Sequence, residues 1–338
     1  MAFTDFNNTF KRNLALLPLF CFLFQVIHSQ TSEKTGQPII EIFTDYHINL
    51  NDTASKSGFG LNRAFFGYKF TPINYFSSTV ILNIGTPEDL PSAAVHRRYA
   101  FFREASVTYA KENLEISFGI TTTRYFYYQQ KFWGKRYIAN TFQALNGYGF
   151  IADLGVVADY KFSDLLSIDF TVMNGEGYSE LQLDNGVKTS TGFTITPSEQ
   201  LSVRFYTDVT KQFGSWQNTF MTFAGFRNGL ITIGAEGNYK TNLDLKKGHN
   251  GWGISATGAI SLSKKYEIFA RYDYSASVKL SEDIYHWNYL NDWNLIIAGL
   301  QYTFNPNFKI ALDYQARIPY DSDLLTTGLI YLNASFKF

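Results

Sequence analysis

Four basic side chains fall in one segment, residues 122–147, that contains no acidic residue. They are Arg124, Lys131, Lys135 and Arg136. Cations without a nearby counter-charge attract anions, so these four are the candidate residues for anion contact. The segment also contains eight aromatic residues, which would be costly on a freely moving loop. We therefore expect it to pack against a wall, with a short helix near 135–145. An outer loop that touches sugar or a neighbouring subunit is the alternative.

Other combinations of reactive residues are weak. The histidines outside the first thirty residues are His47, His96, His249 and His286. None lies in a recognisable nucleophile motif, so the residues for a hydrolase triad are not identified. No two histidines have ligand spacing, which leaves a transition-metal site unsupported. The sequence predicts no enzyme, no metal and no cofactor.

Apolar and polar residues alternate along the chain in runs of about ten, the period of a β-strand with two different faces. In the last run Leu332, Ala334 and Phe336 share one face, opposite Tyr331, Asn333 and Ser335. Sixteen such runs predict strands near 38–49, 60–71, 75–86, 101–111, 114–121, 148–162, 165–174, 187–196, 200–210, 216–226, 229–241, 250–262, 265–276, 290–304, 307–317 and 326–338.

The connections between these runs alternate between tight turns and longer loops, and Phe or Tyr flanks the tight turns. Segment 122–147 is the longest connection and the third on the long-loop side; 211–215 is also expected among the longer ones. Short turns at one end, long loops at the other and a girdle of rings are typical of an outer-membrane barrel. We predict an all-β fold, a transmembrane antiparallel β-barrel of about sixteen strands whose third outer loop folds into the lumen.

The face opposite the apolar residues is expected to line the lumen. Its basic residues include Arg63, Lys69, Arg204, Arg271 and Arg317, and its acidic residues include Glu41, Glu104, Asp159, Asp169, Asp273 and Asp313. A wall with both signs interspersed holds water but does not by itself select one sign of ion.

The composition excludes several other classes. The 338 residues are 45% hydrophobic, 18% aromatic and 17% charged, which excludes intrinsic disorder. Past residue 30, no apolar run is long enough for a membrane-spanning helix. The 29 basic and 29 acidic residues balance, so long-range attraction to nucleic acid is not expected. A soluble sandwich or propeller would also alternate, but no 40–50-residue repeat is found and rings at every tight turn would have no purpose there.

Residues 1–29 are predicted to be a secretory signal peptide, and residues 30–338 the barrel. Lys11 and Arg12 precede an apolar core at 14–27, and the small residue Ser29 precedes a polar stretch. An N-terminal membrane anchor is the alternative. Cys21, the only cysteine, lies in this core, so the mature chain is predicted to contain no cysteine.

The C-terminal residue Phe338, with Phe336 on the same face, resembles the signal by which bacterial outer-membrane proteins are recognised for insertion. Segments 132–137, 148–150 and 152–155, with Asn174–Tyr178, resemble the family of phosphate-selective porins O and P, in its Bacteroidota relatives. That resemblance implies sixteen strands, a trimer, a third outer loop inside the pore and passage of anions along a row of Arg and Lys. The row is not matched residue by residue here.

Two main functions follow as hypotheses, with a hydrolase as a minor third. The first is a porin for passive diffusion of small polar solutes or anions, among them phosphate, constricted by segment 122–147. The second is a non-transport barrel that acts as an adhesin, an anchor or a partner-binding protein. Expected partners are outer-membrane lipid, lipopolysaccharide, the barrel-assembly machinery and two further copies of the chain. Liposome swelling separates the two functions, because a filled barrel admits no sugar.

Overall fold

The computed structural model describes residues 35–51, 57–85, 99–182, 185–212, 214–278, 280, 292–321 and 323–338. The predicted signal peptide, residues 1–29, lies outside the described residues. Within the described part no helix is long and apolar enough to cross a membrane.

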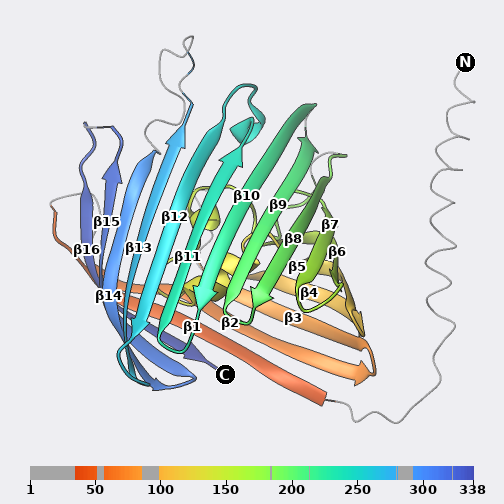
Figure 1. Ribbon diagram of the computed structural model, residues 1–338, viewed down its shortest axis with the longest axis horizontal. Coiled ribbons are helices and arrows are strands. Elements are labelled where there is room, and N and C mark those ends of the chain that lie inside the picture. The colour runs from red at the N-terminus through yellow and green to blue at the C-terminus, as the bar shows by residue number, and fades with distance from the viewer. Residues whose placement is uncertain are drawn as a thin grey trace, which may run out of the picture.

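Sixteen antiparallel strands form one closed barrel, which confirms the predicted fold class and strand number (Figure 1). Each strand pairs with its neighbours in the chain, and β1 pairs with β16 to close the ring. The strands are β1 (Thr35–Asn49), β2 (Gly58–Ile73), β3 (Phe76–Gly85), β4 (Tyr99–Lys111), β5 (Leu114–Thr122), β6 (Ala152–Lys161), β7 (Leu166–Met173), β8 (Lys188–Ser198), β9 (Leu201–Gln212), β10 (Ser215–Arg227), β11 (Ile231–Lys240), β12 (Gly251–Ser261), β13 (Tyr266–Ser277), β14 (Trp293–Asn305), β15 (Phe308–Pro319) and β16 (Thr327–Lys337).

The seam between β1 and β16 contains both residues of the predicted insertion signal. Phe336 pairs with Ile42, and the backbone N–H of Phe338 donates to the carbonyl of Ile40 at 2.8 Å. Closure leaves no sheet edge with unpaired backbone N–H and C=O groups. Such groups would find no hydrogen-bond partner in the hydrocarbon of a membrane. Both rings lie on the outward surface. Their role in insertion stays a prediction.

Apolar side chains point outward from the strands and polar side chains point inward, as the alternation in the sequence predicts. The apolar residues Ile268, Leu312 and Leu332 are 48%, 58% and 50% exposed on the outer surface. The polar side chains of Asp273 and Asn333 are buried on the inner face. An apolar exterior around a polar interior is stable against lipid and not against water.

Pairs of aromatic side chains lie at both ends of the barrel. Beside the tight turns, the rings of Tyr160 and Phe162 lie 4.8 Å apart between centroids, and those of Tyr302 and Phe304 lie 4.7 Å apart. At the long-loop end, the Trp252 and Tyr274 rings lie 5.0 Å apart. Amphipathic rings favour the headgroup level of a bilayer. The predicted girdle beside the tight turns is therefore present, and the other end has one as well.

One predicted connection is wrong. Segment 211–215 was expected to be a longer loop, but β9 extends to Gln212 and β10 begins at Ser215. The two strands pair up to Ser215 and Gln212 themselves, so the connection is a tight turn on the long-loop side. Lys211 and Gln212 are both polar, so the alternation of apolar and polar residues stops before the strand does. The sequence pattern therefore does not indicate the last residues of β9.

Candidate functional site

The connection between β5 and β6, residues 123–151, contains two short helices that pack on the inward-facing side of the barrel strands. Helix α3 spans Tyr127–Trp133, and α4 spans Phe142–Leu145. Gly134 ends α3 in the left-handed conformation at φ 63°, and its N–H donates to the carbonyl of Gln130 at 2.9 Å. The expected helix near 135–145 is thus limited to α4, while α3 lies just before that range. Figure 1 shows both helices behind strands β9–β12.

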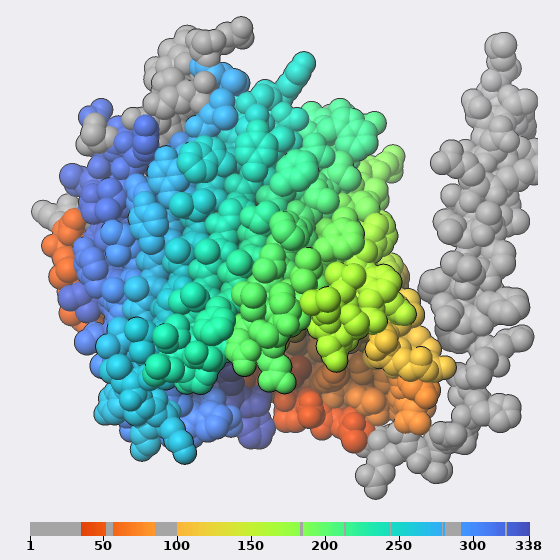
Figure 2. Space-filling view, in the orientation of Figure 1, coloured from red at the N-terminus to blue at the C-terminus, as the bar shows by residue number. Residues whose placement is uncertain are grey.

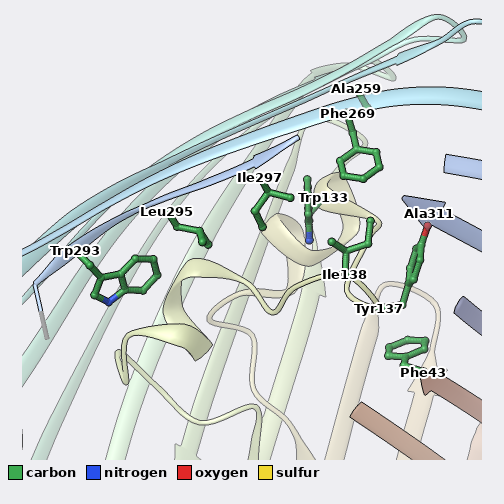
Figure 3. Close-up of a cluster of buried hydrophobic side chains, with 10 residues drawn as sticks. All are labelled: Phe43, Trp133, Tyr137, Ile138, Ala259, Phe269, Trp293, Leu295, Ile297 and Ala311. Atoms are coloured by element: carbon green, nitrogen blue, oxygen red, sulfur yellow. The ribbon is translucent and has the colours of Figure 1, made fainter. Parts of the chain in front are cut away.

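A first apolar contact region joins the end of α3 and the residues after it to strands β1 and β12–β15. The Trp133 and Phe269 ring centroids lie 6.0 Å apart, and those of Tyr137 and Phe43 lie 6.2 Å apart. Figure 3 shows these rings with Ile297, which is fully buried, between the helix and the wall. Burying such side chains stabilises the docked segment by roughly 1.5–3 kcal/mol each.

A second apolar contact region lies under the helices themselves, on β9–β12. The rings of Phe132 and Phe223 are 5.3 Å apart, and those of Tyr125 and Tyr206 are 4.8 Å apart. Phe142 of α4 is completely buried. Tyrosine rings in this region also hydrogen-bond the wall, as the Tyr125 hydroxyl does to Asn238 Oδ1 at 3.1 Å.

Two inward-facing glycines make room for these rings. A Cβ at Gly225 would lie 2.7 Å from the Phe132 ring, and one at Gly253 would lie 2.2 Å from the Phe142 ring. Both distances are shorter than any real contact, so a side chain at either position would displace the facing ring, and at Gly253 it would also meet the carbonyl oxygen of Tyr274 on β13, 2.5 Å away. Glycine at inward positions of a strand is the sequence signal that could have located this docking surface.

We expect Gly253→Leu to push α4 off the wall and to raise single-channel conductance in planar bilayers, because leucine and the Phe142 ring need the same space. Gly258→Leu is the matched control on the same strand. Its Cβ would meet no atom closer than 4.0 Å. Equal conductance in both variants would contradict the docked position of α4.

Backbone carbonyls of the segment accept hydrogen bonds from basic side chains of the wall. Lys240 Nζ donates to the carbonyls of Gly147 and Tyr148 at 3.1 and 3.2 Å. Arg227 Nη2 donates to the carbonyl of Lys131 at 2.6 Å. Lys131 lies in the last turn of α3 and the two other residues lie in a non-helical stretch, so these bonds satisfy carbonyls that burial would otherwise leave unpaired.

Arg204 is the most deeply buried basic residue of the wall, and it holds the start of the segment. Its guanidinium donates to both carboxylate oxygens of Asp169 at 2.6 and 3.0 Å, and to the backbone carbonyl of Arg124 at 2.9 Å. It also lies 5.1 Å from the centroid of the Tyr128 ring. Arg204 therefore positions the segment and is not open to a solute.

Two of the four candidate anion contacts are paired with acids. Arg124 donates to Asp159 through Nε at 2.9 Å and Nη2 at 2.7 Å, and Glu115 lies 3.6 Å away. Lys135 is buried and forms an ion pair with Glu267 at 2.6 Å. Burial lowers the pKa of the Lys135 ammonium, against the opposing effect of Glu267. Both charges are balanced locally.

The other two candidates have no acidic partner among the residues that the structure describes. Lys131 is exposed at the end of α3. Arg136 donates to the side-chain oxygens of Gln130 and Asn140, which are neutral. Burial first, then the charges of Arg63 and Arg103, hold the pKa of the Arg136 guanidinium well below its usual value. Glu41 opposes this effect, so three guanidinium groups and at least one carboxylate act on one another at this place.

Of the remaining basic residues predicted for the lumen wall, two are paired with acids and two are exposed. Arg63 pairs with Glu41 at 2.9 Å, and Arg271 donates to both oxygens of Asp273. Lys69 is exposed, as is Arg317, whose guanidinium lies 4.5 Å from the centroid of the Trp293 ring.

Arg103 is a functional candidate that strict alternation missed. The register places Glu104 opposite Ile81 but Phe102 opposite Leu82, so Arg103 is the extra residue of a β-bulge. The bulge lets Arg103 lie inward together with Glu104, whereas alternation allows only one of them. Its guanidinium lies 5.6 Å from the Tyr178 ring, and its buried Nε has no hydrogen-bond partner within the described part of the chain.

The inner wall is covered unevenly. On the strands that contact the segment, inward side chains such as Thr219 and Asp273 have no exposed surface. Inward side chains of β2 and β3 are half-buried or exposed. These are Arg63, Phe65, Lys69, Thr79, Ile81 and Asn83. The inner wall is therefore less covered along β2 and β3 than on the strands that contact the segment.

No group of three or more potential metal ligands of the His, Cys, Asp or Glu type is found among the described residues.

Comparison with known proteins gives a fold and no family. No protein-family model matches the chain, and no curated protein sequence is similar to it. Among solved structures, Salmonella typhi OmpF in complex with daunomycin matches with a TM-score of 0.66 at 12% identity, over 92% of this chain and all of that one. An anion-selective porin from Comamonas acidovorans matches with 0.66 at 10%, over 90% and 100%. OmpT of Vibrio cholerae in its trimer form matches with 0.60 at 12%, over 91% and 100%. At these identities the likeness establishes the porin-type fold.

Proposed function

We propose that this chain is an outer-membrane porin, a water-filled channel for passive diffusion of small polar solutes. A closed barrel of sixteen strands is wide enough for an aqueous lumen. The shared fold with outer-membrane porins supports this function and this location. Segment 123–151 narrows the lumen in the proposal, because it packs on inward-facing residues of the strands.

The uneven cover of the inner wall is the observation that carries the proposal. A barrel filled for purely structural reasons would bury its inner wall on all sides. Here Phe269 and Ile297 are buried under the segment, while Lys69 and Thr79 across the barrel keep exposed surface. The open path then runs beside β2 and β3, past Arg63 and Lys69, and the buried Arg103 acts on it through its charge and not by contact.

Anions are the solutes that this path favours in the proposal. Arg103 and Arg136 form no ion pair with any described residue, whereas Arg124 and Lys135 are balanced by acids. Guanidinium groups bind carboxylate and phosphate oxygens through pairs of N–H donors. Phosphate remains the anion suggested by the resemblance of residues 132–178, and the likeness to an anion-selective porin agrees with the sign.

Arg103→Gln and Arg136→Gln are each expected to shift the reversal potential in a KCl gradient toward cation preference, because each removes an unbalanced charge beside the path. The double variant K135Q/E267Q is the matched control: it removes both members of one ion pair, so the local net charge does not change and the potential should shift little. Cation preference of the unmodified protein, or equal shifts in all three variants, would contradict the proposed anion path.

Liposome swelling tests the channel itself. Vesicles that contain the protein are expected to swell in small sugars and amino acids, at rates that fall with solute size. A filled barrel that serves as an adhesin or anchor would leave the vesicles unchanged. Such a result would replace the porin proposal with a binding function.

We further propose a homotrimer and a non-enzymatic role. The trimer form of one structural neighbour supports the first. Insertion by the barrel-assembly machinery through Phe336 and Phe338 and surrounding lipopolysaccharide complete the proposed setting. Crosslinking in the native membrane would test the trimer, and absence of a three-chain product would count against it.

A further inference from the structure

An apolar groove of about 530 Å³ lies on the wall formed by β8–β12, outside the lumen. These strands face the viewer in Figures 1 and 2. Its outward-facing lining residues are Thr191, Phe193, Phe205, Thr207, Phe220, Thr222, Gly237, Tyr239, Trp252 and Ile254. The rings of this set are exposed on the outer surface, so the groove opens toward the surrounding lipid.

The groove follows from the register of large and small residues. Thr222 pairs with Gly237, and Thr207 pairs with Phe220. The small residues form the floor, and rings such as Phe205 stand beside them. Because the neighbouring rings project, lipid chains meet a hollow here and not a flat wall.

One end of the groove reaches the aromatic girdle and the level of charged groups. Trp252 and Tyr239 lie at the long-loop ends of β12 and β11. Lys211 lies at the same end of β9, with its Nζ 5.3 Å from the centroid of the Trp216 ring. Lys246 and Lys247 are exposed in the connection between β11 and β12. Lys211, Lys246 and Lys247 thus lie at the long-loop end of the strands that line the groove, and Asp244 is the one acid in the sequence of the connection between β11 and β12.

We propose that this groove is a binding site for lipopolysaccharide, with one acyl chain in the groove and a lipid A phosphate at Lys211, Lys246 and Lys247. An apolar hollow that ends in cations matches an amphiphile with an anionic head. A second copy of the chain would supply the apolar surface but no phosphate for the lysines. The proposal rests on the proposed outer-membrane location, since the long-loop end would face the leaflet that contains this lipid. It does not depend on conduction.

Native mass spectrometry of delipidated protein in detergent, titrated with purified lipopolysaccharide, tests the site. Thr222→Trp fills the groove, and the triple variant K211Q/K246Q/K247Q removes the cations. Both are expected to weaken binding several-fold. Ala298→Trp, outward on β14 and away from the groove, and K264Q/K265Q, at the tight-turn end, are the matched controls and should bind as the unmodified protein does.

Equal binding in all variants would overturn the proposal, as would equally tight binding of phosphatidylglycerol. If Thr222→Trp dissociates the oligomer and leaves lipopolysaccharide bound, the groove is a subunit contact and the proposal is again overturned. A protein that shows the expected binding pattern but does not conduct would refute the channel and leave the lipid site standing.

Discussion

Arg204→Met is expected to lower the free energy of unfolding by about 3–5 kcal/mol, the cost of leaving one member of a buried ion pair alone. Asp169 would lose both guanidinium bonds, at 2.6 and 3.0 Å, in a place where little water can replace them. The carbonyl of Arg124 would lose its donor as well. The shift of the unfolding midpoint in denaturant, followed by the mobility of folded and unfolded barrel on gels, measures this cost.

A double variant separates the ion pair from the space that it fills. Arg204→Met with Asp169→Leu removes both charges, and such replacements are often neutral or stabilising. We expect it to recover most of the lost stability. If Arg204→Met alone unfolds at the same denaturant concentration as the unmodified protein, the pair does not hold the segment to the wall.

Phe142→Ala is expected to cost about 3–5 kcal/mol of docking free energy, as for other fully buried rings. The ring has no exposed surface, and it fills the space above Gly253. A barrel held by sixteen strands does not depend on this ring for its closure. The loss should therefore appear as release of α4, with several-fold larger single-channel conductance and frequent closures, and not as unfolding.

Tyr127→Ala is the matched control for this prediction. Tyr127 lies in α3, but its ring is 46% exposed, so its removal should change conductance little. Unchanged conductance in Phe142→Ala would mean that α4 does not limit the passage. If Phe142→Ala prevents the barrel from folding, the Phe142 ring stabilises the whole barrel and not only the docked position of α4.

The strands were predictable because the two environments of a barrel wall differ sharply at every residue. Leu332 and Asn333 are neighbours in the chain, yet one is exposed outward and the other is buried inward. An alternation of this kind is a local property, since each side chain responds to the face on which it lies. The lengths of the connections and the aromatic residues at the tight turns then indicated that the sheet closes into a barrel, with the short turns at one end and the long loops at the other.

Interruptions of the period were not predictable in the same way. Arg103 lies inward only because β4 contains an extra residue opposite β3. A bulge depends on how two strands pair, and a single sequence does not contain that pairing. Arg103 thus became a candidate for the anion path only through the register.

The basic segment illustrates the same limit for charge. Its four cations and its lack of acids were visible in the sequence. The partner of Lys135 is Glu267, more than one hundred residues away, and the partner of Arg124 is Asp159 on β6. A count of charges in one segment therefore overstates how many of them are unbalanced.

By itself the sequence determined the alternation of faces, the number of strands and the unusual character of residues 122–147, because these depend on residue type and local spacing. The tertiary structure decided which charges are paired, where the inner wall is less covered and where small residues such as Gly253 receive a ring. Those properties depend on contacts between residues that are distant in the chain, and such contacts exist only once the barrel has closed.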